Sequence, residues 1–169
     1  GIKYNSKYKE IIKLAEFCNL PIVTAAGHGD AIPFNHKLHA GQMGPRGNPV
    51  ASRLVKEANV ILAIGTRLGF NSTFYSYENI NKKAKIVHIE LEKKMLGKYF
   101  PIKIGIHADA ATATKQIYEQ IKKNKIEIDV KNWTNLYLKE RNKYLIDRDN
   151  TNLGKNFPIQ PKGLFKKLR

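Results

Sequence analysis

Residues 58–67 read Ala-Asn-Val-Ile-Leu-Ala-Ile-Gly-Thr-Arg, and they contain the clearest strand signal in the chain. Five consecutive apolar residues closed by a glycine are typical of a short strand that is buried on both faces. Similar runs occupy residues 85–90 and 102–106, and a shorter one lies within residues 20–26. Such continuous apolar runs predict a parallel sheet, because parallel strands are covered by helices on both sides.

Helical patterns alternate with these strands. Apolar residues recur at helical spacing over residues 5–18, 50–58 and 111–123, and a further helix is expected around residues 133–145. Residues 31–48, which are rich in glycine and proline, predict a long loop. Strands that alternate with helices indicate an α/β fold with a doubly wound parallel sheet and right-handed crossovers.

Composition restricts the classes of protein to consider. The chain has 169 residues, which suits one domain, and a net charge of +16 that is spread along the sequence rather than gathered in one stripe. We therefore expect no nucleic-acid partner. No apolar run reaches the roughly 20 residues of a membrane helix, and the opening residues lack a signal core. A cytoplasmic location without a membrane partner is expected, and the single Cys18 fits a reduced core residue.

Candidate ligand-binding residues follow the predicted strands. In a doubly wound sheet, ligands bind outside the carboxyl ends of the strands. Arg67 suits a phosphate or carboxylate and Glu90 suits a ribose, although Arg67 could instead pair with a neighbouring acid and Glu90 could cap its own turn. The sequence contains neither a glycine-rich dinucleotide fingerprint nor a set of metal ligands. The candidate cofactor-binding residues are Gly65, Thr66, Arg67, Glu90, Asp109 and Ala110.

Several segments stand in an order that is characteristic of one enzyme family. They are the strand at residues 20–24, the loop His-Gly-Asp-Ala-Ile-Pro at 28–33 with the histidine and glycines that follow it, and residues 58–67, 85–90 and 105–110. Together they resemble the central domain of thiamine diphosphate-dependent enzymes of the acetolactate synthase, pyruvate oxidase and sulfoacetaldehyde acetyltransferase group. The resemblance covers about residues 8–122 and implies a Rossmann-like fold.

This resemblance implies a domain organisation. Residues 1–125 would form the central domain without its first strand, residues 126–156 a helix and linker, and residues 157–169 the start of the diphosphate-binding domain. In the family, a glutamate that activates the cofactor and a Gly-Asp-Gly to Asn motif that holds Mg²⁺ lie in the flanking domains. Thiamine diphosphate and Mg²⁺ would therefore be bound outside this chain, which holds no catalytic residue and should be inactive alone.

The resemblance also implies partners and a substrate class. The whole enzyme would be a homodimer or homotetramer that acts on a 2-oxo acid or a sulfoacetaldehyde-like compound, and FAD or another nucleotide could bind this domain. His28 and Asp30 would lie at the substrate entrance. A free-standing nucleotide-binding module is the alternative.

Some positions depart from the family pattern. Lys37 stands where the family usually has a proline, and Asn59 stands where it has an aspartate. The family's acidic pair appears here as Glu90 and Glu92, and the longer glutamate side chains affect the geometry expected for a bound flavin. Residues 67–73, with Tyr75 and Tyr77 beyond them, look more like sulfoacetaldehyde acetyltransferases than acetolactate synthases.

Overall fold

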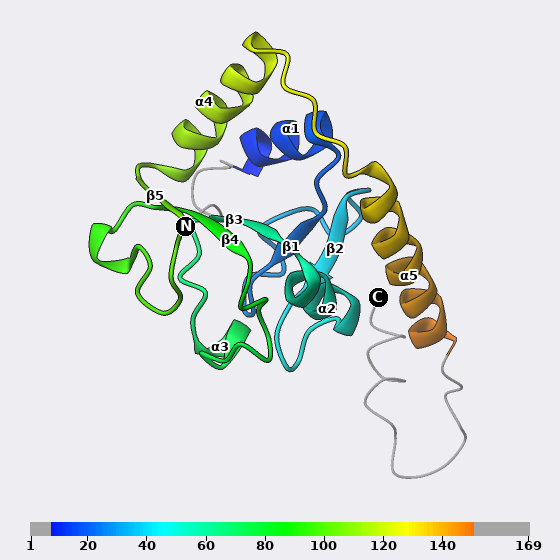
Figure 1. The fold of residues 1–169 in the computed structure, drawn as a ribbon. Helices are drawn as coiled ribbons and strands as arrows, with labels where there is room; N and C mark the ends of the chain where they lie inside the picture. Colours follow the sequence, from blue (N-terminus) through cyan, green and yellow to red (C-terminus); the bar gives the residue numbers. More distant parts are fainter. Residues whose placement is uncertain (1–7, 151–169) are drawn as a thin grey trace.

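The computed structural model describes residues 8–150, which form an α/β domain (Figure 1). Strands lie in the middle of the molecule, and helices flank them on two sides. In chain order the elements are α1 (Tyr8–Cys18), β1 (Ile22–Thr24), β2 (His39–Gln42), α2 (Pro49–Glu57), β3 (Val60–Ile64), α3 (Phe70–Thr73), β4 (Lys85–Glu90), the 3-10 helix η2 (Lys93–Met95), β5 (Ile104–His107), α4 (Ala110–Lys123) and α5 (Lys131–Asp149).

The strands are all parallel, but they form two separate ladders. One ladder holds β1 and β2, and the other holds β3, β4 and β5 in that order. The second is regular: Val60 to Ile64 pair residue by residue with Lys85 to Ile89. A parallel sheet was therefore predicted correctly, although β1 and β3 do not pair with each other.

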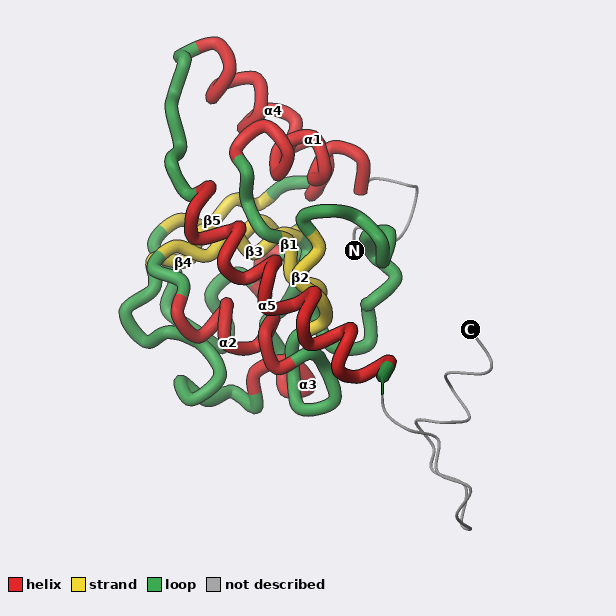
Figure 2. The backbone as a smooth tube through the Cα atoms, turned by 90° about the vertical axis from the view of Figure 1, so that its right-hand side faces the viewer, coloured by secondary structure: helices red, strands yellow, loops and turns green. Residues whose placement is uncertain are grey.

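Helices cover the strands from both sides, as a doubly wound fold requires. α1 packs against α4 on one side, and α2 packs against β2 and α5 on the other. Figure 2 shows α1 and α4 side by side above the strands, with α2 below them. The predicted helices α1, α2 and α4 are confirmed, and two begin at a side-chain cap. Asn48 Oδ1 accepts a hydrogen bond from the Val50 amide, and Asp109 Oδ1 accepts one from the Thr112 amide.

The main core joins the two ladders on the side of α2. Its buried members come from α2, β3, β4 and the loops that follow β2, β3 and β4 in the chain, and Val23 of β1 packs against them. A second cluster of Ala40, Leu54 and Tyr137 fastens α5 to β2 and α2. Packing therefore connects the ladders where backbone pairing does not. The main cluster consists of Met43, Val55, Ala63, Leu68, Ile80, Ile86 and Phe100.

The prediction of an uninterrupted loop over residues 31–48 was wrong, because β2 lies within it. Ile22 pairs with His39 and Val23 pairs with Gly41, so β2 extends β1 in parallel. The strand sequence His-Ala-Gly-Gln has no apolar run to reveal it, and burial against α2 and α5 stabilises it instead. α5 spans Lys131–Asp149 and so extends beyond both ends of the helix expected around residues 133–145.

Candidate functional site

Loops from both ladders meet at the carboxyl edge of the strands. The Ala26 amide, two residues after β1, donates a hydrogen bond to Ser72 Oγ at 3.1 Å, and Ser72 lies in the short helix that follows β3. Gly44, just after β2, lies so close that a Cβ atom there would be 2.6 Å from the Asn71 carbonyl oxygen. The carboxyl ends of β1, β2 and β3 therefore form one continuous surface.

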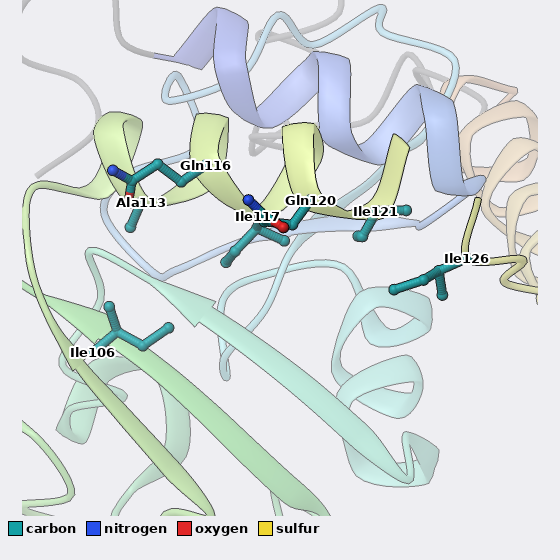
Figure 3. A pocket seen from close by; sticks show the side chains of 7 residues that line it. All are labelled: Ile106, Ala113, Gln116, Ile117, Gln120, Ile121 and Ile126. Atoms are coloured by element: carbon teal, nitrogen blue, oxygen red, sulfur yellow. The ribbon is translucent and has the colours of Figure 1, made fainter. Parts of the chain in front are cut away.

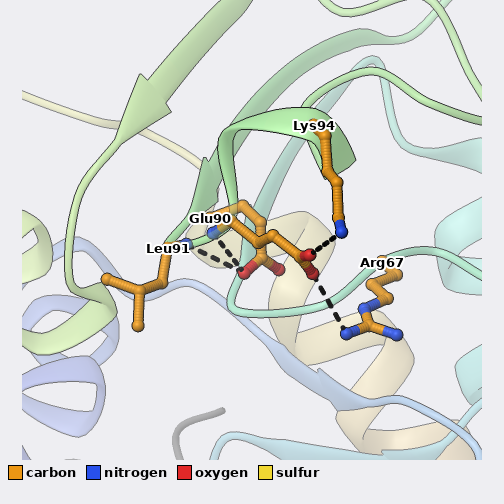
Figure 4. Close-up of polar contacts among 5 residues, drawn as sticks. Arg67, Glu90, Leu91 and Lys94 are labelled. Carbon is orange, nitrogen blue, oxygen red and sulfur yellow. Dashed lines mark hydrogen bonds and ion pairs between the residues drawn. The ribbon is translucent and has the colours of Figure 1, made fainter.

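Arg67 forms part of a small ionic cluster on this edge (Figure 4). Its guanidinium is 3.3 Å from Glu92 Oε2, and Lys94 Nζ is 2.7 Å from Glu92 Oε1. The hydrogen bond from Lys94 is the largest effect that holds the pKa of Glu92 below its usual value, and the charge of Arg67 acts in the same direction. Two cations therefore share the Glu92 carboxylate. Arg67 thus pairs with a neighbouring acid, the alternative recognised from the sequence.

Glu90 also takes the alternative arrangement, because its carboxylate caps the turn after β4. Glu90 Oε1 accepts hydrogen bonds from the Leu91 amide at 2.8 Å and the Glu92 amide at 3.2 Å (Figure 4). These bonds fix the turn that presents Glu92 to Arg67. A ribose hydroxyl would have to share or replace them.

The remaining candidate residues shape the loops at the same edge. Gly65 has a φ of 56°, in the left-handed region that glycine adopts most easily, and it turns the chain after β3. Thr66 Oγ1 accepts a hydrogen bond from the Leu68 amide at 3.4 Å. Asp109 caps α4, and Ala110 is the first residue of that helix. These contacts give all four residues structural roles at the sites where ligand contacts were predicted.

His88 is a site residue that sequence reasoning missed. It is 2% exposed, and its ring joins two loops: Nδ1 accepts a hydrogen bond from the Gly97 amide at 3.3 Å, and Nε2 lies 2.8 Å from the Thr66 carbonyl oxygen. Because Nδ1 accepts, the proton resides on Nε2, which donates to Thr66. The only sequence signal is a histidine within an apolar strand, between Val87 and Ile89.

His28 and Asp30 lie on the loop that follows β1, and both are exposed. Two turns shape this part of the loop: the His28 amide donates to the Ala25 carbonyl at 3.0 Å, and the Ala31 amide donates to the His28 carbonyl at 3.1 Å. Through the bond between Ala26 and Ser72, the loop adjoins the segment after β3. The structure thus places both side chains at the carboxyl edge.

Exposed aromatic rings border the edge beyond Arg67. Phe70, Phe74, Tyr75 and Tyr77 are 53%, 42%, 48% and 38% exposed. Phe74 and Tyr75 have φ values of 50° and 55°, a conformation that is rare for residues with a large side chain. Tyr75 and Tyr77 were noted in the sequence, whereas the two phenylalanines were missed.

Comparison with known proteins identifies the family. Residues 1–117 match the sequence model described as "Thiamine pyrophosphate enzyme, central domain". The chain belongs to this family. The central domain so identified agrees with the α/β architecture and parallel strands described above.

The relatives of this central domain are considerably longer proteins. It is 32% identical over 131 residues to a sulfoacetaldehyde acetyltransferase of Castellaniella defragrans, an alignment that covers 76% of the chain and 22% of the relative. It is 35% identical over 111 residues to the sulfoacetaldehyde acetyltransferase of Roseovarius nubinhibens, with 64% and 18% covered. A probable acetolactate synthase large subunit of Methanococcus aeolicus is 26% identical over 178 residues, with 99% and 28% covered. The chain thus spans less than a third of these relatives.

The described part of the chain has an apolar hollow but no cluster of metal ligands. Within residues 8–150, no group of three or more His, Cys, Asp or Glu side chains could bind a metal ion. Across the same residues, no helix is long and apolar enough to cross a membrane. A hollow of about 270 Å³ lies between α4 and β5, but its lining is apolar (Figure 3). Its lining residues are Ile106, Ala113, Gln116, Ile117, Gln120, Ile121 and Ile126.

Proposed function

We propose that this chain is the non-catalytic central domain of a longer thiamine diphosphate-dependent carboligase or lyase. The match of residues 1–117 to the family's central domain carries the proposal. Thiamine diphosphate supplies the carbanion chemistry in such enzymes, and the protein contributes binding and orientation. In this proposal, the cofactor and its Mg²⁺ are bound by other domains of the longer protein. The isolated chain is inactive on this account.

The substrate class that fits best is a small anionic carbonyl compound, either a 2-oxo acid or a sulfoacetaldehyde-like molecule. The names of the relatives support both, and sulfoacetaldehyde acetyltransferases share the higher identities. Arg67 and Lys94 also support an anionic substrate, because positive side chains attract an anion and raise its rate of association.

The loop with His28 and Asp30 forms the substrate entrance in this proposal. Both residues are exposed at the carboxyl edge, where ligands bind in parallel α/β sheets. A double variant with His28→Ala and Asp30→Ala in the longer enzyme is expected to raise KM several-fold. The matched control is Asp129→Ala, an exposed residue in the segment between α4 and α5. Unchanged KM and kcat in the double variant would refute the assignment.

Nucleotide binding stays a separate prediction for the same edge. FAD or another nucleotide would contact Gly65 to Arg67, Glu90, and the start of α4 at Asp109 and Ala110. Such a ligand must compete with the ion pair between Arg67 and Glu92 and with the amides that bind Glu90. Titration of the longer enzyme with FAD, followed by flavin fluorescence, tests the prediction. Saturable binding that weakens in Arg67→Ala supports it, and the absence of binding refutes it.

The longer protein is proposed to be a homodimer or homotetramer in the cytoplasm. Light scattering with size exclusion measures its assembly, and a fluorescent fusion in the source cells shows its location. A stable monomer would contradict the first statement, and a secreted or membrane-bound pool would contradict the second.

We further propose that another parallel strand, carried by residues that precede α1 in the longer protein, lies between β1 and β3. Within residues 8–150, each of these strands is paired on one side only, and the order β2-β1 followed by β3-β4-β5 leaves one place open in the usual doubly wound strand order. Val60 is 63% exposed although β3 is wholly apolar. The proposed domain bounds stay as predicted: a central domain over residues 1–125, a helix and linker over 126–156, and the start of the diphosphate-binding domain over 157–169. Residues 1–7 and 151–169 lie outside the described part.

Hydrogen exchange tests the additional strand. The amides of β1 and β3 are expected to exchange more slowly in the longer protein than in the 169-residue chain, because a new strand would bond those on the open edges. The amides of β5 serve as an internal control. Equal exchange of β1 and β3 in both proteins would refute the strand.

A further inference from the structure

α5 lies beyond the residues that match the family, yet it is firmly docked on the domain. Its buried side chains are Thr134, Tyr137 and Arg141, which are spaced to lie on one side of the helix. Thr134 Oγ1 donates a hydrogen bond to the Asn19 carbonyl at 2.7 Å, and the Tyr137 hydroxyl donates to the Glu57 carboxylate. The side of α5 that packs on the domain therefore carries polar groups, and the hydroxyls of Thr134 and Tyr137 each donate a hydrogen bond to an acceptor on the domain.

Arg141 contacts the loop between β1 and β2. Only 9% of the residue is exposed, and its guanidinium donates a hydrogen bond to the Phe34 carbonyl oxygen at 3.0 Å. The same group lies 5.5 Å from the centroid of the Phe34 ring, within the range of a cation–π contact. The Phe34 ring also meets the buried His39 ring edge-on at 6.3 Å. Phe34 is thus fixed from two sides.

Burial of an arginine has to be explained, because a buried charge is costly unless it is paired or hydrogen-bonded. A leucine or methionine at this position would dock the helix at least as well. Unlike these side chains, the guanidinium of Arg141 donates a hydrogen bond to the Phe34 carbonyl oxygen, and its flat face contacts the Phe34 ring. Its contacts are therefore best suited to fixing the loop.

The loop is also held from the opposite side by α1. Glu16 lies 3.4 Å from His36 Nε2 and 3.1 Å from Lys37 Nζ, and Ile32 is 3% exposed. The segment that contains Phe34 and His36 is thus held between two helices. The exposed residues His28 and Asp30 precede this segment directly, so its position and the turns after β1 together set theirs.

We propose that Arg141 is a positioning residue, which fixes the loop of residues 27–38 and so couples the position of α5 to the substrate entrance. The role assigned to the entrance rests on the proposed function, whereas the control of loop order by Arg141 does not. Since α5 leads toward the residues that follow the central domain, a shift in their position would reach the loop of His28 and Asp30 through Arg141.

The test compares three variants in the longer enzyme. Arg141→Ala removes the bond and the ring contact, and Arg141→Lys keeps the charge but loses the planar donor group. Arg53→Ala is the matched control, because Arg53 pairs with Glu140 of α5 and lies over the Tyr137 ring without contacting the loop. Each variant is examined by hydrogen exchange of residues 27–38 and by steady-state kinetics with the substrate that the longer enzyme turns over.

In Arg141→Ala we expect amides of residues 27–38 to exchange about tenfold faster, the effect of losing one hydrogen bond from a charged donor. Arg141→Lys should restore part of the protection, and Arg53→Ala should leave the loop unchanged. KM should rise several-fold in Arg141→Ala while kcat is largely kept.

The two measurements separate the possible failures. Unchanged exchange in Arg141→Ala, or equal acceleration in Arg53→Ala, would overturn the positioning role. Faster exchange with wild-type KM would overturn the coupling to a substrate entrance and count against the proposed function of the loop.

Discussion

Truncation of Tyr137 tests how firmly α5 is docked. The side chain is 2% exposed, packs on Ala40 and Leu54, and meets the Trp133 ring at 5.0 Å. For Tyr137→Ala we expect a loss of roughly 3–5 kcal/mol in the free energy of unfolding, the usual range for removing a large buried ring. Tyr137→Phe should cost only about 1 kcal/mol, because it keeps the ring and loses one hydrogen bond to a carboxylate that water can still reach.

Urea denaturation followed by circular dichroism gives both free energies, and the fluorescence of Trp133 reports separately on α5. In a chain of this length, the alanine variant should also melt about 10 °C lower than the wild type. If Tyr137→Ala cost less than about 1 kcal/mol, the docking of α5 would be refuted. If the phenylalanine variant cost as much as the alanine variant, the hydrogen bond rather than the packing would be the main contribution.

The same residue predicts a response to alkaline pH. Burial, and then the hydrogen bond to Glu57 and its charge, raise the pKa of Tyr137 from 10.0 to about 12. A folded pKa above the unfolded value contributes stability that is fully present below pH 10 and is lost as the pH rises through 12. The wild type should therefore lose its advantage over Tyr137→Phe across this range. A constant difference between the two would contradict the assignment.

Three further predictions concern the carboxyl edge and β2. Gly44→Ala should destabilise the chain by roughly 1–3 kcal/mol, because its φ is +102° and the new Cβ would meet the Asn71 carbonyl; a wild-type urea midpoint would contradict this. Ser72→Ala should cost about 1 kcal/mol and accelerate exchange of the Ala26 amide, and an unchanged exchange rate would count against the contact between the two loops. Burial lowers the pKa of His39 below 6.5, and the charge of Arg141 adds to this effect, so stability should fall as the pH drops below 6.5; this slope should flatten in His39→Gln, and melting temperatures between pH 7 and 5 decide the point.

The strands that could be predicted from sequence are those that carry their own signal. β3 and β4 are largely apolar runs closed by Gly65 and Glu90, so that composition alone predicts them as strands, although only Ala63 of β3 is buried and Val60 is exposed. β2 could not be found in this way, because it is stabilised by pairing with β1 and by the packing of α2 and α5 on it, and these contacts exist only in the folded chain. Its short, partly polar sequence resembles the loop on either side.

The candidate site shows a similar limit. The positions of Arg67, Glu90 and Asp109 at the carboxyl edge follow from the strand pattern, and the structure agrees. Their contacts depend on details that the pattern does not contain: Glu92 reaches Arg67 because Glu90 holds the intervening turn. The link through His88 needs the fold as well, since it joins residues 22 positions apart.

The contacts of α5, which lies beyond the residues that match the family, could not be predicted from the sequence either. A helix was expected around residues 133–145, but its apolar residues alone gave no indication of where it docks. Its position depends on polar bonds from Thr134 and Arg141 to backbone carbonyls as well as on the packing of Tyr137, and such bonds leave no periodic apolar signal.

The most direct measurement is calorimetric binding of thiamine diphosphate with Mg²⁺, made on the protein expressed from the complete coding sequence and on the 169-residue chain. We expect the longer protein to bind the cofactor and, once loaded, to consume pyruvate or sulfoacetaldehyde, whereas the chain alone does neither. Binding of the cofactor by the chain alone, or no binding by the longer protein, would contradict the assignment of this chain as a non-catalytic central domain.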